Sequence, residues 1–228
     1  MSKVVALMSM SLDGYVADRE DGVAEVFAWY FSGDVEFHTG GADPMTFTVS
    51  APSAEHLRSL VAGLGAMLTG RRTFDKAHGW NGNHAWGPSF VLTHQIPGGW
   101  PQPSSTVHFV TDGVESAVRQ AKAAAGGKNV GVHGADTIQQ LLNAGLLDEI
   151  QVDIVALLLG AGMSRFATNH DGGIAHDRAS HLHHEVLVGL PGVREQGDAE
   201  TTHAAGSRPD HLLAYGLHRS RPSTAARA

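Results

Sequence analysis

The stretch VGVHGADTIQQLLNAGLLD, residues 130–148, predicts a strand, a glycine turn, a helix and an exit turn in that order. A β-branched run leads to Gly134, which gives the backbone freedom for a tight turn. Asp136 and Gln139 have capping-box spacing, so we expect the helix to begin at Asp136 and to end at Gly145. The exposed N–H groups at such a helix start suit a phosphate, but an ordinary β-turn-α connection has the same pattern.

A second glycine-led turn follows the short apolar segment 66–69. Here GRRT, residues 70–73, combines a glycine for close approach, two arginines and a threonine hydroxyl at an expected helix start. These groups suit an anion such as a ribose phosphate. A solvated arginine pair on a helix is the alternative interpretation.

Short apolar runs alternate with helical patterns through most of the chain. We expect strands at residues 3–9, 66–69, 89–93, 107–110 and 147–159, and a further short strand that ends at residue 132. We expect helices from a cap at Ser53 to about residue 63, from a capping box at Asp112 and Glu115 to about residue 125, and at 136–144. This alternation predicts an α/β fold with a largely parallel sheet covered on both faces.

Aromatic residues are concentrated in residues 23–37. The side chains are Phe27, Trp29, Tyr30, Phe31 and Phe37. They predict either a helix that covers an edge of the core or a pocket wall for a flat ring. We expect residues 38–52 to form a loop, because Gly40, Gly41 and Pro44 interrupt any regular pattern there.

Composition narrows the class of protein. The 228 residues carry a net charge of −7, which argues against a nucleic-acid partner. The absence of cysteine excludes disulfides, thiolate metal sites and a cysteine nucleophile. The start of the chain lacks the pattern of a signal peptide, and no apolar run approaches the length of a membrane helix, so we expect a cytoplasmic protein without a membrane partner.

The character of the sequence changes after about Met163. His181, His183 and His184 have alternate spacing but no fixed carboxylate partner, so we expect no metal site. We divide the chain into a domain at 1–190 and a poorly ordered extension at 191–228, which could add an edge strand near residues 211–217.

Four motifs together carry a resemblance to a known family. They are SLDGY at 11–15, GRRTF at 70–74, FVLTH at 90–94, and HGADTIQQLLNAGLLDEI at 133–150 with LLLGAG after it. In this order they resemble the dihydrofolate-reductase-like superfamily, and within it the branch named for the C-terminal reductase domain of bifunctional riboflavin-biosynthesis proteins. The resemblance covers roughly residues 3–166. It implies a three-layer α/β/α fold with a central, mostly parallel sheet, one antiparallel C-terminal strand, and NADPH bound across the carboxyl ends of the strands.

The resemblance also assigns residues to the cofactor. Those near the adenosine and its phosphates are Gly70, Arg71, Arg72, Thr73, Thr93 and His94, and those near the pyrophosphate are His133, Gly134, Ala135, Asp136 and Thr137. The loop from Ser11 to Tyr15 would lie over the nicotinamide, with Asp13 facing the reaction centre. The family usually has two successive glycines at the last turn, whereas this chain has His133 at the first position.

The implied function is reduction of a small ring-containing substrate, pterin-like or riboflavin-precursor-like, by hydride transfer from NADPH. Arg71 and Arg72 would favour NADPH over NADH by pairing with its 2′-phosphate. His133 and the altered C-terminal region favour an alternative, a catalytically inactive nucleotide-binding protein of the same fold. Related domains are commonly dimers, and the apolar strand predicted at 150–159 would be an open sheet edge, so we expect a homodimer that uses the C-terminal third.

Overall fold

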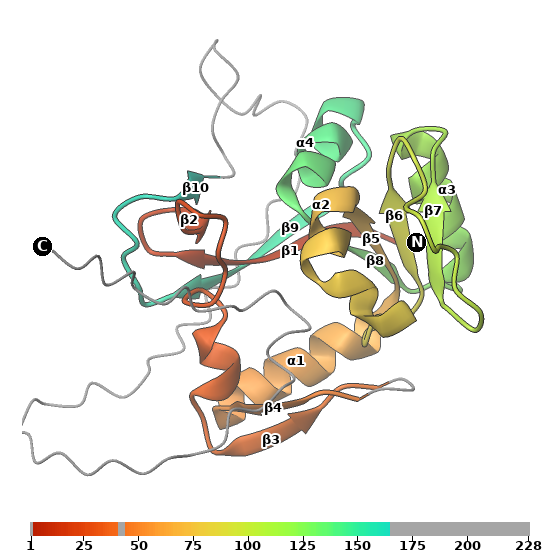
Figure 1. The fold of residues 1–228 in the computed structure, drawn as a ribbon. Helices are drawn as coiled ribbons and strands as arrows, with labels where there is room; N and C mark the ends of the chain where they lie inside the picture. The colour runs from red at the N-terminus through yellow and green to blue at the C-terminus, as the bar shows by residue number, and fades with distance from the viewer. Residues whose placement is uncertain (1, 41–43, 165–228) are drawn as a thin grey trace, which may run out of the picture.

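The computed structural model describes residues 2–40 and 44–164, and its centre is a six-stranded sheet in the order β7-β6-β5-β8-β1-β9 (Figure 1). Every neighbouring pair in this sheet is parallel. Its strands are β1 (Val4–Ser11), β5 (Leu64–Gly70), β6 (Ser89–Leu92), β7 (Val107–Val110), β8 (Asn129–His133) and β9 (Glu149–Val155). The predicted parallel sheet is therefore confirmed.

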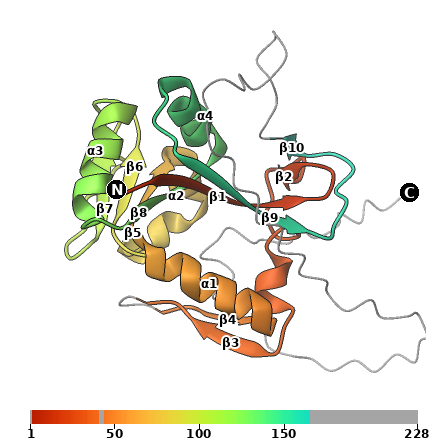
Figure 2. The ribbon, with the colours of Figure 1, turned by 180° about the vertical axis from the view of Figure 1, so that it is seen from behind.

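Helices cover both faces of the sheet, as Figures 1 and 2 show. On one face lie α3 (Val114–Ala124) and α4 (Ala135–Ala144); on the other lies α1 (Ala51–Gly63), with the antiparallel hairpin of β3 (Val35–His38) and β4 (Thr46–Val49) beyond it. The smaller elements are η1 (Ala28–Phe31), α2 (Arg71–Lys76), η2 (His78–Gly82), β2 (Tyr15–Ala17) and β10 (Met163–Ser164). This arrangement confirms the three-layer α/β/α class.

The core follows from the alternation of side chains along the inner strands. In β1, Val4 and Ala6 pack toward α3 and α4, whereas Val5 and Leu7 pack toward α1. Successive side chains of a strand point to opposite faces, so a strand covered on both sides is apolar throughout. This packing explains why the N-terminal strand carries no polar alternation.

The glycine turns begin two of the helices differently from the prediction. The capping boxes are wrong: α4 begins at Ala135 after Gly134, and α3 begins at Val114 after Gly113, neither with a side-chain cap. A glycine with positive φ directs the chain from the turn into the helix without a capping side chain. Asp136 therefore lies in the first turn of α4, where its negative charge interacts favourably with the helix dipole. The predicted end at Gly145 is confirmed, because Gly145 is left-handed with φ +67.

The segment before β5 was also predicted incompletely. The helix α1 is capped at Ser50 rather than Ser53, because the Ser50 hydroxyl accepts a hydrogen bond from the Ser53 N–H at 3.3 Å. The region expected as a loop contains β4, and the region expected as a helix contains only the short η1 before β3. Four-residue strands are too short to show a clear period of alternation in the sequence. The hairpin is stabilised by stacking of Phe37 on Phe47 across the two strands, with the ring centroids 6.2 Å apart.

Several predictions fall outside the part of the chain that the structure describes. They are the domain division at 190, the edge strand near 211–217 and the histidine cluster at 181–184. In the described part, no helix has both the length and the apolar character that crossing a membrane requires.

Candidate functional site

A cavity of about 720 Å³ opens where the carboxyl ends of the parallel strands meet. Its volume is in the range typical of small-molecule sites. All eleven residues that the resemblance assigned to a cofactor line it: Gly70, Arg71, Arg72, Thr73, Thr93, His94, His133, Gly134, Ala135, Asp136 and Thr137. The structure therefore brings residues from three separate sequence segments to one cavity.

The two glycine turns lie against each other because β5 and β8 are neighbours in the sheet. The Thr69 hydroxyl donates a hydrogen bond to the carbonyl of His133 at 3.1 Å. A Cβ on Gly134 would lie 2.7 Å from Thr73 Oγ1, and one on Gly70 would lie 2.8 Å from Thr137 Oγ1. Both turns therefore need glycine for their close approach, and together they form a cradle of backbone and threonine hydroxyls.

The N-terminus of α4 points unpaired donors into this cradle. The N–H of Ile138 is the first to bond within the helix, to the carbonyl of Gly134 at 3.0 Å. The N–H groups of Ala135, Asp136 and Thr137 precede it and have no carbonyl within α4 to receive them. Backbone donors at the positive end of a helix dipole suit a phosphate.

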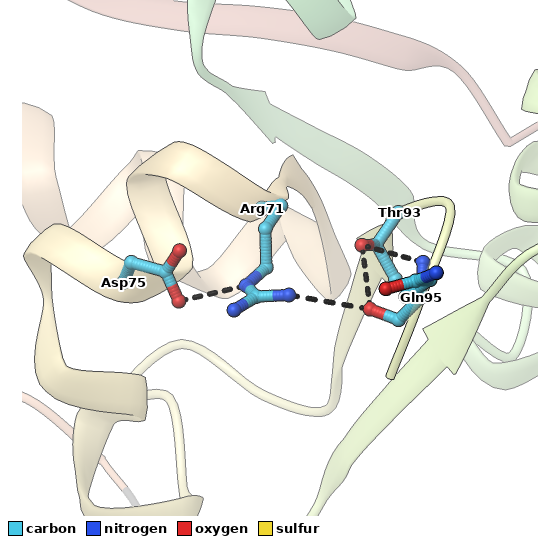
Figure 3. Close-up of polar contacts among 4 residues, drawn as sticks. All are labelled: Arg71, Asp75, Thr93 and Gln95. Carbon is cyan, nitrogen blue, oxygen red and sulfur yellow. Dashed lines mark hydrogen bonds and ion pairs between the residues drawn. The ribbon is translucent and has the colours of Figure 1, made fainter. Parts of the chain in front are cut away.

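Arg71 lies at the side of the cavity between α2 and the end of β6 (Figure 3). Its Nε donates to Asp75 Oδ1 at 2.8 Å, and its Nη1 donates to the carbonyl of Gln95 at 3.2 Å. The Thr93 hydroxyl donates to the same carbonyl at 2.9 Å. These contacts hold the guanidinium beside the segment that follows β6.

Arg72 and Lys76 lie around one carboxylate. Arg72 donates to Asp21 Oδ2 through Nε at 2.8 Å and approaches it through Nη2 at 2.7 Å, and the Lys76 ammonium lies 3.7 Å from the same oxygen. All three residues line the cavity. Asp21 therefore stands where an anionic ligand group would meet these cations.

Aromatic side chains form the opposite wall of the cavity. Phe27, Tyr30, Phe31, Phe47 and Trp86 line it. The first four also belong to the core cluster on the α1 side, where Trp29 and Tyr30 stack at 4.0 Å. The aromatic segment therefore packs against the core and also lines the cavity, with the short η1 in place of the helix that was one of the two predictions.

His133 packs into this wall. The centroid of its ring lies 5.6 Å from that of the Trp86 indole and 6.0 Å from that of the His84 ring, edge to face in both cases. Burial lowers the pKa of His133 to about 4, and burial together with His133 lowers that of His84 to about 3. Both imidazoles are therefore neutral near pH 7, and the Nδ1 of His84 accepts a hydrogen bond from the N–H of Trp86 at 3.1 Å.

Asp13 is not among the residues that line the cavity. Its carboxylate accepts hydrogen bonds from the Ser11 hydroxyl at 2.6 Å, the Leu159 N–H at 3.1 Å and the Gly160 N–H at 2.7 Å. These donors, first of all Ser11, hold the pKa of Asp13 below its usual value. The contacts show Asp13 joining the loop after β1 to the loop after β9, apart from the other predicted site residues.

Asp153 was not predicted as a site residue. It lies on β9 opposite Ser9 of β1, lines the cavity and is 9% exposed. The signal in the sequence is a carboxylate between two apolar residues, Val152 and Ile154, in the second half of the strand. Within residues 2–40 and 44–164, no group of three or more histidine, aspartate or glutamate side chains is arranged to hold a metal ion.

The sequence model of the RibD C-terminal domain family matches residues 2–186. This match covers most of the chain, so the chain belongs to the RibD C-terminal domain family, and the resemblance inferred from the motifs is confirmed. A sequence search of curated proteins gives no match.

Solved structures provide a second comparison. A protein from Shewanella sp. PV-4 named for riboflavin biosynthesis is 22% identical, with a TM-score of 0.51 over 75% of this chain and 86% of that chain. A diaminohydroxyphosphoribosylaminopyrimidine deaminase/5-amino-6-(5-phosphoribosylamino)uracil reductase from Thermotoga maritima is 14% identical, with a TM-score of 0.49 over 75% of this chain and 51% of that chain. A riboflavin biosynthesis reductase from Saccharomyces cerevisiae is 14% identical, with a TM-score of 0.39 over 72% of this chain and 77% of that chain. The Shewanella structure shows that the two chains share a fold.

Proposed function

We propose that this chain is an NADPH-dependent reductase that acts on a small ring-containing substrate, pterin-like or riboflavin-precursor-like. The observation that carries the proposal is the single cavity that joins two glycine turns and three cationic side chains to an aromatic wall. Such a cavity offers one region for the phosphates of a dinucleotide and another for flat rings. Membership of the RibD C-terminal domain family supports a substrate related to riboflavin precursors.

The residues present fit a dinucleotide phosphate. Gly70 and Gly134 leave room that a Cβ would fill, and the N–H groups at the start of α4 supply donors for a pyrophosphate. A bound nicotinamide would supply the hydride, and the protein would bind, orient and shield the two reacting partners. Arg71, Arg72 and Lys76 would supply the charge that distinguishes NADPH from NADH.

Titration of NADPH and NADH against the intrinsic tryptophan fluorescence tests the cofactor assignment. We expect NADPH to bind at least about tenfold more tightly, since a phosphate paired with arginine contributes more than ~1.4 kcal/mol. Arg71→Ala and Arg72→Ala should reduce this preference, whereas Arg58→Ala, an exposed arginine of α1 that does not line the cavity, should preserve it. Equal weak binding of both nucleotides, or none, would exclude the NADPH assignment.

Turnover separates the reductase from the inactive alternative. We expect oxidation of NADPH, followed by absorbance, with a member of a panel of pterins, flavin precursors and quinones. Binding of NADPH without oxidation across that panel would instead favour a nucleotide-binding protein without reductase activity. In that case His133→Gly should tighten NADPH binding, because the variant restores the first of the two successive glycines that the family has at this turn.

A further inference from the structure

The positive charge of the cavity lies on one side of it. Within the described residues, every lysine and arginine that lines the cavity belongs to α2, and these are Arg71, Arg72 and Lys76. Two of them already face an anion, because Asp21 Oδ2 lies 2.7 Å from Arg72 Nη2 and 3.7 Å from the Lys76 ammonium. A phosphate that enters the cavity therefore finds its cations beside α2.

The part of the lining that packs around α1 is apolar, and we call it the ring half. Its residues are Leu7, Phe27, Tyr30, Phe31, Phe47, Leu60 and Trp86. They belong to two apolar clusters, and Leu60 packs against both. The centroid of the Tyr30 ring lies 4.8 Å from that of Phe47 and 5.6 Å from that of Phe27. Aromatic faces therefore follow one another along the ring half, which suits a flat ligand larger than a single ring.

The polar side chains that line the cavity next to the ring half supply no positive charge at neutral pH. Ser9 carries a hydroxyl, and the pKa of His133, which burial lowers to about 4, keeps its imidazole neutral. Asp153 is an acid, and its partner is His56 Nε2 at 3.2 Å. A phosphate dianion moved from water to such a wall would lose its hydration without gaining a paired cation, which is unfavourable.

We propose that the ring half binds an uncharged, fused-ring compound that carries no phosphate, so that all phosphates in the filled cavity belong to the nucleotide. The compound is the substrate of the reductase, so this assignment rests on the proposed function and narrows its substrate class. A fused ring gains from stacking on aromatic faces, and its carbonyl and N–H groups suit the neutral Ser9 hydroxyl and His133 imidazole. The phosphate ester of the same compound is excluded by its charge.

Titration with two matched probes tests the proposal on the full chain, with and without saturating NADP⁺. The probes are riboflavin and flavin mononucleotide, which differ only by one phosphate ester, and quenching of flavin fluorescence reports binding. We expect riboflavin to bind at least about tenfold more tightly, because only its partner must desolvate a phosphate. Leu60→Arg, which adds a cation to the ring half, should remove most of this preference. Ser59→Arg, at an exposed position of α1 outside the cavity lining, should keep it.

Equal binding of the two probes by the wild type, tighter binding of flavin mononucleotide, no binding of either, or an undiminished preference in Leu60→Arg would overturn the proposal. If that variant does not fold, amide NMR of the wild type decides: the Phe47 signal should shift on adding riboflavin, and the signal of Lys122 on α3 should not. NADPH titrations of the same samples separate the two proposals. A riboflavin preference without NADPH binding leaves the ring half assigned and rejects the reductase, whereas NADPH oxidation without the preference does the reverse.

Discussion

At the scale of single residues, Gly134 connects the fold to the cradle that the two glycine turns form, which we propose binds phosphate. Its φ is +87, and an added Cβ would lie 2.7 Å from Thr73 Oγ1. Gly127 is a matched control, because its φ is +89 but an added Cβ would meet nothing within 4 Å. The pair separates the cost of the backbone conformation from the cost of the close approach.

We expect Gly127→Ala to lower the free energy of unfolding by about 1 kcal/mol, from backbone strain alone. Gly134→Ala should cost at least as much and should also displace the Thr73 hydroxyl, which raises the Kd for NADPH about tenfold. Urea unfolding and fluorescence titration measure the two effects. Unchanged NADPH affinity in Gly134→Ala would show that this turn is not part of the nucleotide site.

Asp21 provides a second test at a single residue. Its Oδ2 lies 2.7 Å from Arg72 Nη2 and 3.7 Å from the Lys76 ammonium, so it competes with any phosphate for these cations. We expect Asp21→Asn to tighten NADPH binding about fivefold, or ~1 kcal/mol, and to leave NADH nearly unchanged. Asp34→Asn, at an exposed position before β3, is the control. Weaker NADPH binding in Asp21→Asn would show that Asp21 positions the cations rather than competing for them.

At the scale of elements, the end of β8 packs its His133 against His84, which follows η2. Burial lowers the pKa of these imidazoles to about 4 and about 3, from 6.5. The unfolded chain therefore binds protons below pH 6.5 that the folded chain excludes. The contribution of the two neutral imidazoles to the free energy of unfolding is fully present above pH 6.5. It is lost progressively as the pH falls toward the pKa values of the folded chain.

We expect the free energy of unfolding to fall by about 1–2 kcal/mol between pH 7 and pH 5, mainly through His84, which is 5% exposed, and less through His133, which lines the cavity. Urea unfolding at a series of pH values measures this slope. His84→Asn should flatten it, because an amide does not titrate, whereas His108→Asn, at an exposed histidine, should leave it unchanged. A wild-type stability that stays constant from pH 7 to pH 5 would contradict the burial of these rings.

Local patterns predicted the elements whose signals are contained within a few residues. The apolar runs of the parallel strands, the two glycine turns and the left-handed end at Gly145 are such cases. The starts of α3 and α4 were predicted wrongly, because a glycine turn and a capping box are adjacent and both can begin a helix.

Contacts between distant segments could not be predicted in this way. The donors to Asp13 include backbone N–H groups of the loop at 159–160, which only the sheet order brings close. The contact of Asp153 with His56 depends in the same way on the packing of α1 against the sheet. The part of the cavity lining that follows β5, β6 and β8 could therefore be predicted from motifs, whereas its β9 side needed the structure.

At the scale of the whole molecule, we propose a homodimer that uses the C-terminal third. In the described sheet β9 is an edge strand, and beyond it Leu158 is 70% exposed, near Leu12 at 61%. An open edge with apolar neighbours favours association with a second copy. Light scattering after size exclusion, at tens of micromolar, should give twice the 24.0 kDa mass of the chain.

Substitution separates this interface from general apolar exposure. Leu158→Asp should shift the protein toward the monomer mass, and Ile96→Asp, at a 49% exposed position on the segment after β6, should not. A monodisperse wild-type monomer at that concentration would remove the dimer proposal.

A crystal structure with NADP⁺ tests the central claim most directly. We expect the pyrophosphate within hydrogen-bonding distance of the N–H groups at the start of α4, and the 2′-phosphate beside Arg71 or Arg72. Density for the dinucleotide at another surface, or no density in the cavity at saturating NADP⁺, would contradict the assignment of this cavity as a nicotinamide-nucleotide site.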